Sequence, residues 1–87
     1  MPEISHFFGI IIRMFSEPDA PHHYPHFHAY YGDYRISVEI HTGIVEGRFP
    51  RRALNAVMEW YQLHKDELLE DWLLAEQHRP LKKIVPL

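Results

Sequence analysis

The sequence predicts an α+β protein with a small antiparallel sheet of about four strands, followed by one kinked or two short helices packed on one face. Three observations lead to this prediction. Residues 26–49 hold short segments of alternating apolar and polar residues separated by glycine-containing turns, which is the pattern of hairpin strands. Residues 50–79 repeat apolar side chains at helical spacing. The 87 residues suffice for a single domain over 1–87, with one modest core.

The first 49 residues form the predicted β-rich half. Strands are expected at four segments: residues 4–15, 26–31, 34–41 and 44–49. The first is long, so Gly9 is predicted to form a β-bulge within it. Gly32-Asp33 is predicted to form a tight hairpin turn. Three prolines exclude regular structure from residues 16–25, which we expect to be a loop rich in proline and histidine.

The second half is predicted to be helical over residues 50–79, with Pro50 at the first helical position. One apolar stripe supports this: Leu54, Val57, Met58, Tyr61, Leu68, Leu69, Trp72 and Leu73. The segment HKD at 64–66 interrupts the stripe, as a kink or as a turn capped by Asp66. Pro80 ends the helix. Residues 80–87 are expected to dock back on the domain as an extended tail.

Strand alternation predicts a polar face on the side of the sheet opposite the helices. Seven side chains are expected there: Arg13, His26, His28, Tyr30, Arg35, Glu39 and His41. The same alternation sends Phe8, Ile10, Ile12 and Met14 toward the core, and it sends Phe7, Ile11 and Phe15 outward. Apolar side chains on an exposed sheet face require a cover, such as a second subunit, the tail or a partner protein.

Three functions remain open for this face. His26 and His28, with His41 or Glu39 as the third ligand, could bind zinc, nickel or iron, because two histidines at His-x-His spacing on a strand point the same way. A metal-independent ribonuclease would use histidines as base and acid and an arginine for the phosphate; the candidates are His26, His28, Glu39 and Arg35. The third function is protein–protein interaction, and we place it first.

Arginines offer a separate candidate for anion binding. Arg48, Arg51 and Arg52 lie around the predicted start of the helix, and Arg13 lies on the polar face. Cations at a helix N-terminus oppose the helix dipole, which is expected if they meet an anion there. The alternative is that these arginines are solvated or pair with acidic side chains.

Composition narrows the classes of function. The net charge is −3 with neutral histidines, which argues against a general nucleic-acid coat protein, although RNA stays a possible ligand. The chain has no cysteine, so disulfides and thiolate zinc sites are excluded, and a reducing compartment is favoured. Neither a membrane span nor an export signal is visible. We therefore predict a cytoplasmic protein without membrane contact.

The segments PHFHAYYGDY at 25–34, GRFPRRALNAVMEWYQLHKDELLEDW at 47–72 and PLKKIVPL at 80–87 carry a resemblance to a known family. The chain resembles small bacterial proteins grouped as domain-of-unknown-function family 4160. His22 and His23 depart from the commoner PPHFHA motif of that family. Genes of this family often lie beside a gene for another small protein, an arrangement similar to toxin–antitoxin pairs. The resemblance implies a small protein partner encoded nearby, with a homo-oligomer as the alternative, and assigns no catalytic residue.

Overall fold

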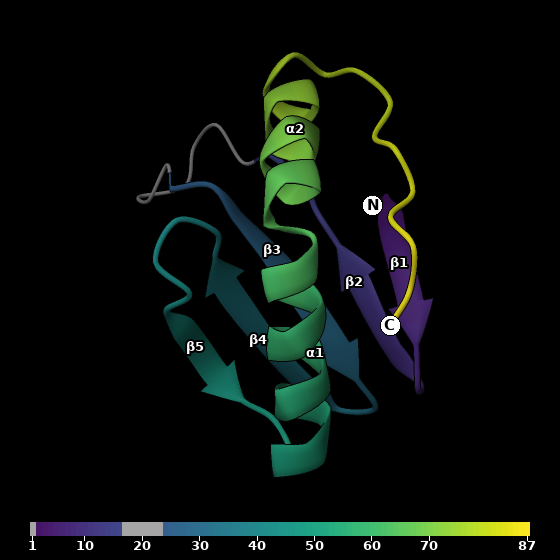
Figure 1. The fold of residues 1–87 in the computed structure, drawn as a ribbon, viewed down its shortest axis with the longest axis vertical. Helices are drawn as coiled ribbons and strands as arrows, with labels where there is room; N and C mark the ends of the chain where they lie inside the picture. Colours follow the sequence, from purple (N-terminus) through teal and green to yellow (C-terminus); the bar gives the residue numbers. More distant parts are fainter. Residues whose placement is uncertain (1, 17–23) are drawn as a thin grey trace.

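The computed structural model describes residues 2–16 and 24–87. Within these residues, five antiparallel strands form one sheet in the order of the sequence, and two helices cover one of its faces (Figure 1). The strands are β1 (Glu3–Phe7), β2 (Ile10–Arg13), β3 (His26–Tyr31), β4 (Tyr34–Glu39) and β5 (Val45–Arg48). The helices are α1 (Arg51–Leu63) and α2 (Lys65–Glu76). The α+β prediction is confirmed, with one strand more than expected.

The extra strand comes from a hairpin where one long strand was predicted. Phe8 and Gly9 form a two-residue turn between β1 and β2, with φ values of 52° and 78°. Two residues with positive φ are typical of the turn that matches the twist of a hairpin. The prediction of a bulge at Gly9 was therefore wrong. So was the side assigned to the two phenylalanines, because Phe7 is buried in the core and Phe8 is 70% exposed at the turn.

The hairpin of β3 and β4 is confirmed. The two strands pair from His26–Glu39 to Tyr31–Tyr34 around the predicted turn. Strand β4 ends at Glu39, two residues before its predicted end. The Glu39 N–H donates to the Ile44 carbonyl and the Gly43 N–H donates to the Glu39 carbonyl, and these bonds close a turn that leads into β5. Of the predicted loop at 16–25, residues 17–23, which include His22 and His23, lie outside the described residues.

The core lies between the sheet and the helices. On the sheet side it contains Ile10, Ile12, Met14, Phe27, Ala29, Ile36, Val38 and Ile40. Trp60 of α1 is fully buried against Phe27, with ring centroids 5.7 Å apart. The Tyr61 hydroxyl donates to the Ile40 carbonyl at 2.6 Å, which fixes α1 over the end of β4.

The helical half is divided at His64, so the two-helix alternative holds. The His64 backbone has φ −123° and ψ 22°, outside the helical region, and its ring Nδ1 lies 2.6 Å from Glu67 Oε1. Asp66 lies in the first turn of α2 and is not its cap, contrary to the prediction. The break changes the phase of the apolar stripe, so that Leu73 is exposed. Pro50 has an extended backbone and precedes α1, so it is not the first helical residue. Helix α2 ends at Glu76, three residues before the predicted end at residue 79.

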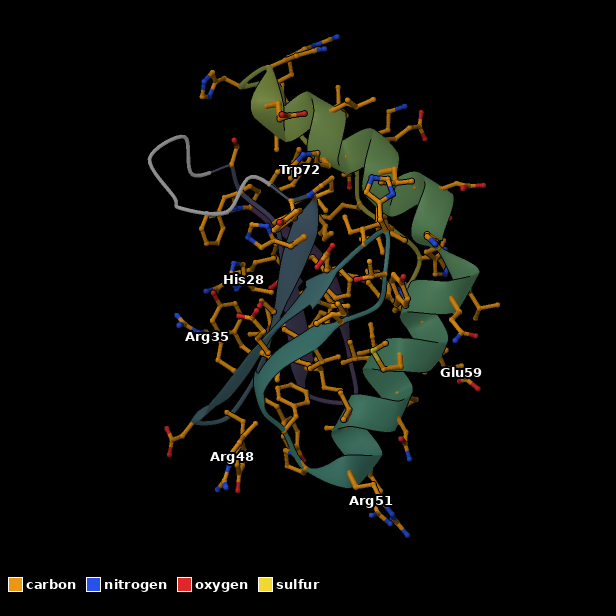
Figure 2. All side chains as sticks on the ribbon, turned by 90° about the vertical axis from the view of Figure 1, so that its left-hand side faces the viewer. His28, Arg35, Arg48, Arg51, Glu59 and Trp72 are labelled. Carbon is orange, nitrogen blue, oxygen red and sulfur yellow. The ribbon has the colours of Figure 1, made fainter. Side chains whose placement is uncertain are left out.

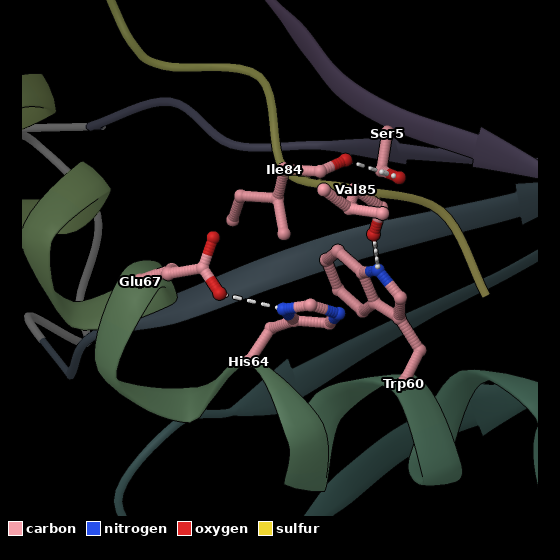
Figure 3. A network of polar contacts seen from close by, with 6 residues as sticks. All are labelled: Ser5, Trp60, His64, Glu67, Ile84 and Val85. Atoms are coloured by element: carbon pink, nitrogen blue, oxygen red, sulfur yellow. Dashed lines mark hydrogen bonds and ion pairs between the residues drawn. The ribbon is translucent and has the colours of Figure 1, made fainter.

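The C-terminal tail docks as predicted, alongside β1 on the side of the sheet that carries the helices (Figure 1). Its Ile84 N–H donates to the Ile4 carbonyl at 2.8 Å, and the Ser5 hydroxyl donates to the Ile84 carbonyl at 2.9 Å. Trp60 Nε1–H donates to the Val85 carbonyl at 2.9 Å (Figure 3). The tail therefore covers one edge strand of the sheet and satisfies the indole N–H of a buried tryptophan.

The start of the tail is attached to a buried carboxylate. Asp71 on α2 is 1% exposed, and its Oδ1 accepts the Lys82 backbone N–H at 2.9 Å. Its Oδ2 is buried with no hydrogen-bond partner in the described part of the chain. Burial raises the pKa of Asp71 above its ordinary value of 3.8, and the Lys82 N–H opposes the rise.

This carboxylate predicts a specific pH dependence of stability. Between the ordinary pKa and the raised folded-state pKa, the unfolded chain releases the proton while the folded chain keeps it, so stability falls as pH rises. Asp71→Asn keeps an acceptor for the Lys82 N–H and removes the charge. We therefore expect the free energy of unfolding of the variant, minus that of the parent, to be larger at pH 7 than at pH 4. Urea unfolding of both proteins at the two pH values measures this difference. An equal difference at the two pH values would contradict this assignment.

Candidate interaction face

The face of the sheet opposite the helices is the candidate functional site, and we call it the outer face. Its side chains come from alternate positions of all five strands and from Phe15, which follows β2. In Figure 2, His28, Arg35 and Arg48 lie on the sheet side of the molecule, away from Glu59 on α1. The outer face comprises Glu3, His6, Ile11, Arg13, Phe15, His26, His28, Tyr30, Arg35, Ser37, Glu39, Glu46 and Arg48.

Strand register arranges these side chains in rows across the sheet. The first row is His6, Ile11, Tyr30, Arg35 and Arg48. The middle row is Glu3, Arg13, His28, Ser37 and Glu46. The third row contains His26 and Glu39, which pair in register two positions further along β3 and β4. We add Phe15 to this row, because it lies two residues after Arg13, beyond the end of β2, where it is stacked on His28. The prediction that several strands contribute to one polar surface holds, and its centre is aromatic.

The centre of the outer face is a cluster of stacked rings. His28 is stacked on Phe15, with centroids 4.9 Å apart and planes inclined by 6°. His26 meets the edge of His28 at 5.1 Å, and on its other side it lies 5.1 Å from Trp72 of α2. The contact of His26 with Trp72 was missed at the sequence level, because a helical tryptophan on an apolar stripe indicates only a core position.

Histidine nitrogens in this cluster are largely occupied or covered. His26 Nδ1 lies 2.7 Å from the Tyr24 carbonyl, which only accepts, so Nδ1 carries the proton. Both ring nitrogens of His28 are buried from solvent. A general acid or base must reach the atom with which it exchanges a proton. The structure thus places the four predicted catalytic residues (His26, His28, Glu39 and Arg35) on one face, but His28 packs there through its ring.

The predicted metal ligands do not come together. His41 lies beyond the end of β4, where it lines a pocket with Met58, Tyr61 and Lys65, on the helix side of the domain. Among residues 2–16 and 24–87, no three histidine, aspartate or glutamate side chains are grouped so that they could hold a metal ion. The set of His26, His28 and His41 therefore does not fit a three-ligand site for zinc, nickel or iron.

The predicted anion site is divided as well. Arg13 and Arg48 belong to the outer face, whereas Arg51 and Arg52 lie on the first turn of α1. Figure 2 shows Arg48 and Arg51 on these two parts of the molecule. The Arg13 guanidinium carbon lies 5.2 Å from the centre of the Tyr30 ring, a cation–π contact. Its Nε is buried without a hydrogen-bond partner among the described residues. Within the described residues, this buried donor on the outer face is therefore unsatisfied.

The other outer-face arginines are also available for a partner. Arg35 is paired in register with Arg48, which places two like charges directly opposite each other on neighbouring strands. Such a pair is destabilising unless an anion lies between the charges. In the described part of the chain, His64 and Glu67 lie within ion-pair distance of each other. None of the charged side chains of the outer face forms such a pair there.

The fold and the outer face together define a small α+β protein with helices on one side of a sheet and an aromatic and charged surface on the other. Residues 9–73 match the family model described as a domain of unknown function, DUF4160. The chain belongs to that family. It has no significant match among curated proteins or among solved structures. In the parts that the structure describes, neither helix combines the length and apolar content needed to cross a membrane.

Proposed function

We propose that this protein is a cytoplasmic protein-interaction module that binds another protein through its outer face. The observation that supports this best is the buried Nε of Arg13, which has no hydrogen-bond partner among residues 2–16 and 24–87, beside a cluster of half-buried aromatic rings. Protein interfaces are enriched in aromatic residues and arginine at their centre and are ringed by polar and charged residues. Arg13, Tyr30, His28 and Phe15 are residues of this kind, and Ile11 adds a half-buried apolar contact.

The charge of the outer face favours protein over RNA. Its three arginines are balanced by three glutamates, Glu3, Glu39 and Glu46. An RNA-binding surface would be basic overall, since phosphate contacts supply most of the affinity. The burial of the His28 nitrogens further disfavours the ribonuclease alternative. The family resemblance favours a small partner encoded nearby, as in a toxin–antitoxin-like pair.

A copurification experiment tests this function. The chain is expressed together with the product of the neighbouring gene, with a tag on that second protein. Tyr30→Ala and Arg35→Ala each remove a central side chain of the outer face, and each is expected to weaken copurification by about tenfold or more, the effect typical of an interface hot spot. Leu73→Ala is the matched control, because Leu73 is 57% exposed on α2, in the opposite layer.

Equal recovery of the parent and the outer-face variants would contradict the proposal, provided that circular dichroism shows all variants folded. Growth arrest with RNA cleavage by the parent, abolished by His26→Ala, would instead support the ribonuclease alternative. These two results are distinguishable in the same strains.

A further inference from the structure

We propose that the outer face pairs with the outer face of a second copy of this chain, with Arg35 of each copy opposite Glu39 of the other. The inference rests on the proposed function, because it names an occupant for the same surface. It would add a layer to the fold, so that two sheets pack face to face and the helices lie on the outside.

The repeat of side chains along the strands carries the argument. On β4 the outward residues are Arg35, Ser37 and Glu39, so opposite charges lie two positions either side of the middle row. On β3 the corresponding residues are Tyr30, His28 and His26. Along β2 and the residues after it they are Ile11, Arg13 and Phe15. Each strand therefore carries different side chains in the first and third rows.

A two-fold axis that runs across the strands, along the middle row, places the first-row residues of β2, β3 and β4 over the three third-row residues of the other copy. Arg35 then meets Glu39, Tyr30 meets His26, and Ile11 meets Phe15. The three contacts are an ion pair, an aromatic pair and an apolar pair. A two-fold interface is self-complementary in this way, since every contact occurs twice.

The alternative two-fold axis, along β3, is disfavoured by the same residues. It exchanges β2 with β4, and it would place Ile11 over Arg35 and Phe15 over Glu39. Both contacts set an apolar side chain against a charge, which leaves the charge desolvated and unpaired. The arrangement across the strands also keeps the strands of the two sheets aligned, as in packed sandwiches whose sheets lie about 10 Å apart.

Within the described residues of one copy, Arg35 and Glu39 form no ion pair with each other or with another side chain, so they can pair across the interface. Arg35 and Glu39 are four residues apart on one strand, which separates them by about 13 Å. Neither forms an ion pair within residues 2–16 and 24–87. A glutamate from the second copy would also relieve the repulsion between Arg35 and Arg48. In the middle row each residue meets its own copy, and the Arg13 guanidinium is turned off the axis, over Tyr30. Glu3 and Glu46 also meet their own copies, but they lie on the two edge strands, where solvent and salt screen their charges.

Charge reversal tests the pairing. The parent is expected to be a dimer by sedimentation equilibrium, and Arg35→Glu or Glu39→Arg is expected to raise the dimer Kd by about tenfold or more, because like charges then face each other twice. The double variant exchanges the two charges and is expected to return within about threefold of the parent, as coupling between contacting residues predicts. Arg52→Glu on α1 is the control, and it is expected to remain a dimer.

Three outcomes would overturn the pairing. The first is a monomeric parent across the micromolar range, and the second is a double variant that is as monomeric as the single variants. A monomeric parent that still copurifies with the neighbouring protein, and loses it on Arg35→Ala, would overturn self-pairing while leaving the proposed function intact. The third is a dimer that resists both charge reversals, which would show that another surface mediates association.

Discussion

Replacing Ile84 by alanine is expected to lower the free energy of unfolding by about 2–5 kcal/mol, the range for truncating a buried aliphatic side chain to alanine. Ile84 is 3% exposed, although it lies only three residues before the last residue, Leu87, in a segment without helix or strand. Its side chain belongs to the core. Its backbone N–H donates a hydrogen bond to the Ile4 carbonyl, and its carbonyl accepts one from the Ser5 hydroxyl. Since small domains have only about 5–15 kcal/mol of stability, this loss would be a large fraction of the total.

Val85→Ala is the matched control for this prediction. Val85 follows Ile84 directly but is 68% exposed, so its truncation is expected to change stability by less than about 0.5 kcal/mol. Urea unfolding of the parent and both variants, followed by tryptophan fluorescence, measures the difference. Similar midpoints for the two variants would show that the tail does not contribute to the core in solution.

Replacing Gly47 by alanine is expected to cost about 3 kcal/mol, the upper end of the range for a strained backbone. Gly47 lies in β5 with φ +109°, a conformation that L side chains rarely adopt. A Cβ at this position would lie 2.5 Å from the Arg35 carbonyl oxygen and 3.2 Å from the Ile36 Cα. These are backbone atoms of the neighbouring strand, so β5 must move away from β4 to relieve the contact.

Gly32→Ala separates the effect of the close contact from the effect of positive φ. Gly32 has φ +56°, but a Cβ added there meets nothing within 4 Å. Its cost should be about 1 kcal/mol, the penalty of the left-handed conformation alone. Thermal unfolding of both variants, with amide exchange to follow β5, measures the two costs. If Gly47→Ala is no worse than Gly32→Ala, β5 is not held as closely as the structure shows.

Several elements of the fold could be predicted from local patterns. The segment HFHAYY at 26–31 was predicted as a strand and is β3 without a change of boundary. The alternation of β4 placed Ile36 and Val38 in the core and Arg35 and Glu39 on the opposite face, as the structure has them. Such predictions succeed because the face of a strand depends only on odd or even position, once one buried residue is known.

The errors arose where a turn or helix end shifted that alternation. Phe8 with positive φ is an uncommon conformation for an aromatic residue, so nothing in FFG distinguished a turn from a bulge. One turn reversed the sides of Phe7 and Phe8. In the helical half, the break at His64 altered the phase and brought Leu73 to the surface. The local preference of the residues does not predict such shifts, because the packing of segments distant in sequence selects between a turn and a bulge, or between one helix and two.

The sequence by itself determined the α+β class, the order of strands and helices, the docking tail and the face on which His26 and His28 lie. All of these follow from the spacing of apolar residues and from the positions of proline and glycine. Only the tertiary structure decided that His28 packs as a stacked ring, that His41 lies apart from the other histidines, and that Asp71 is buried under the tail. Those facts depend on distances between segments remote in sequence, and burial of the whole core sets such distances.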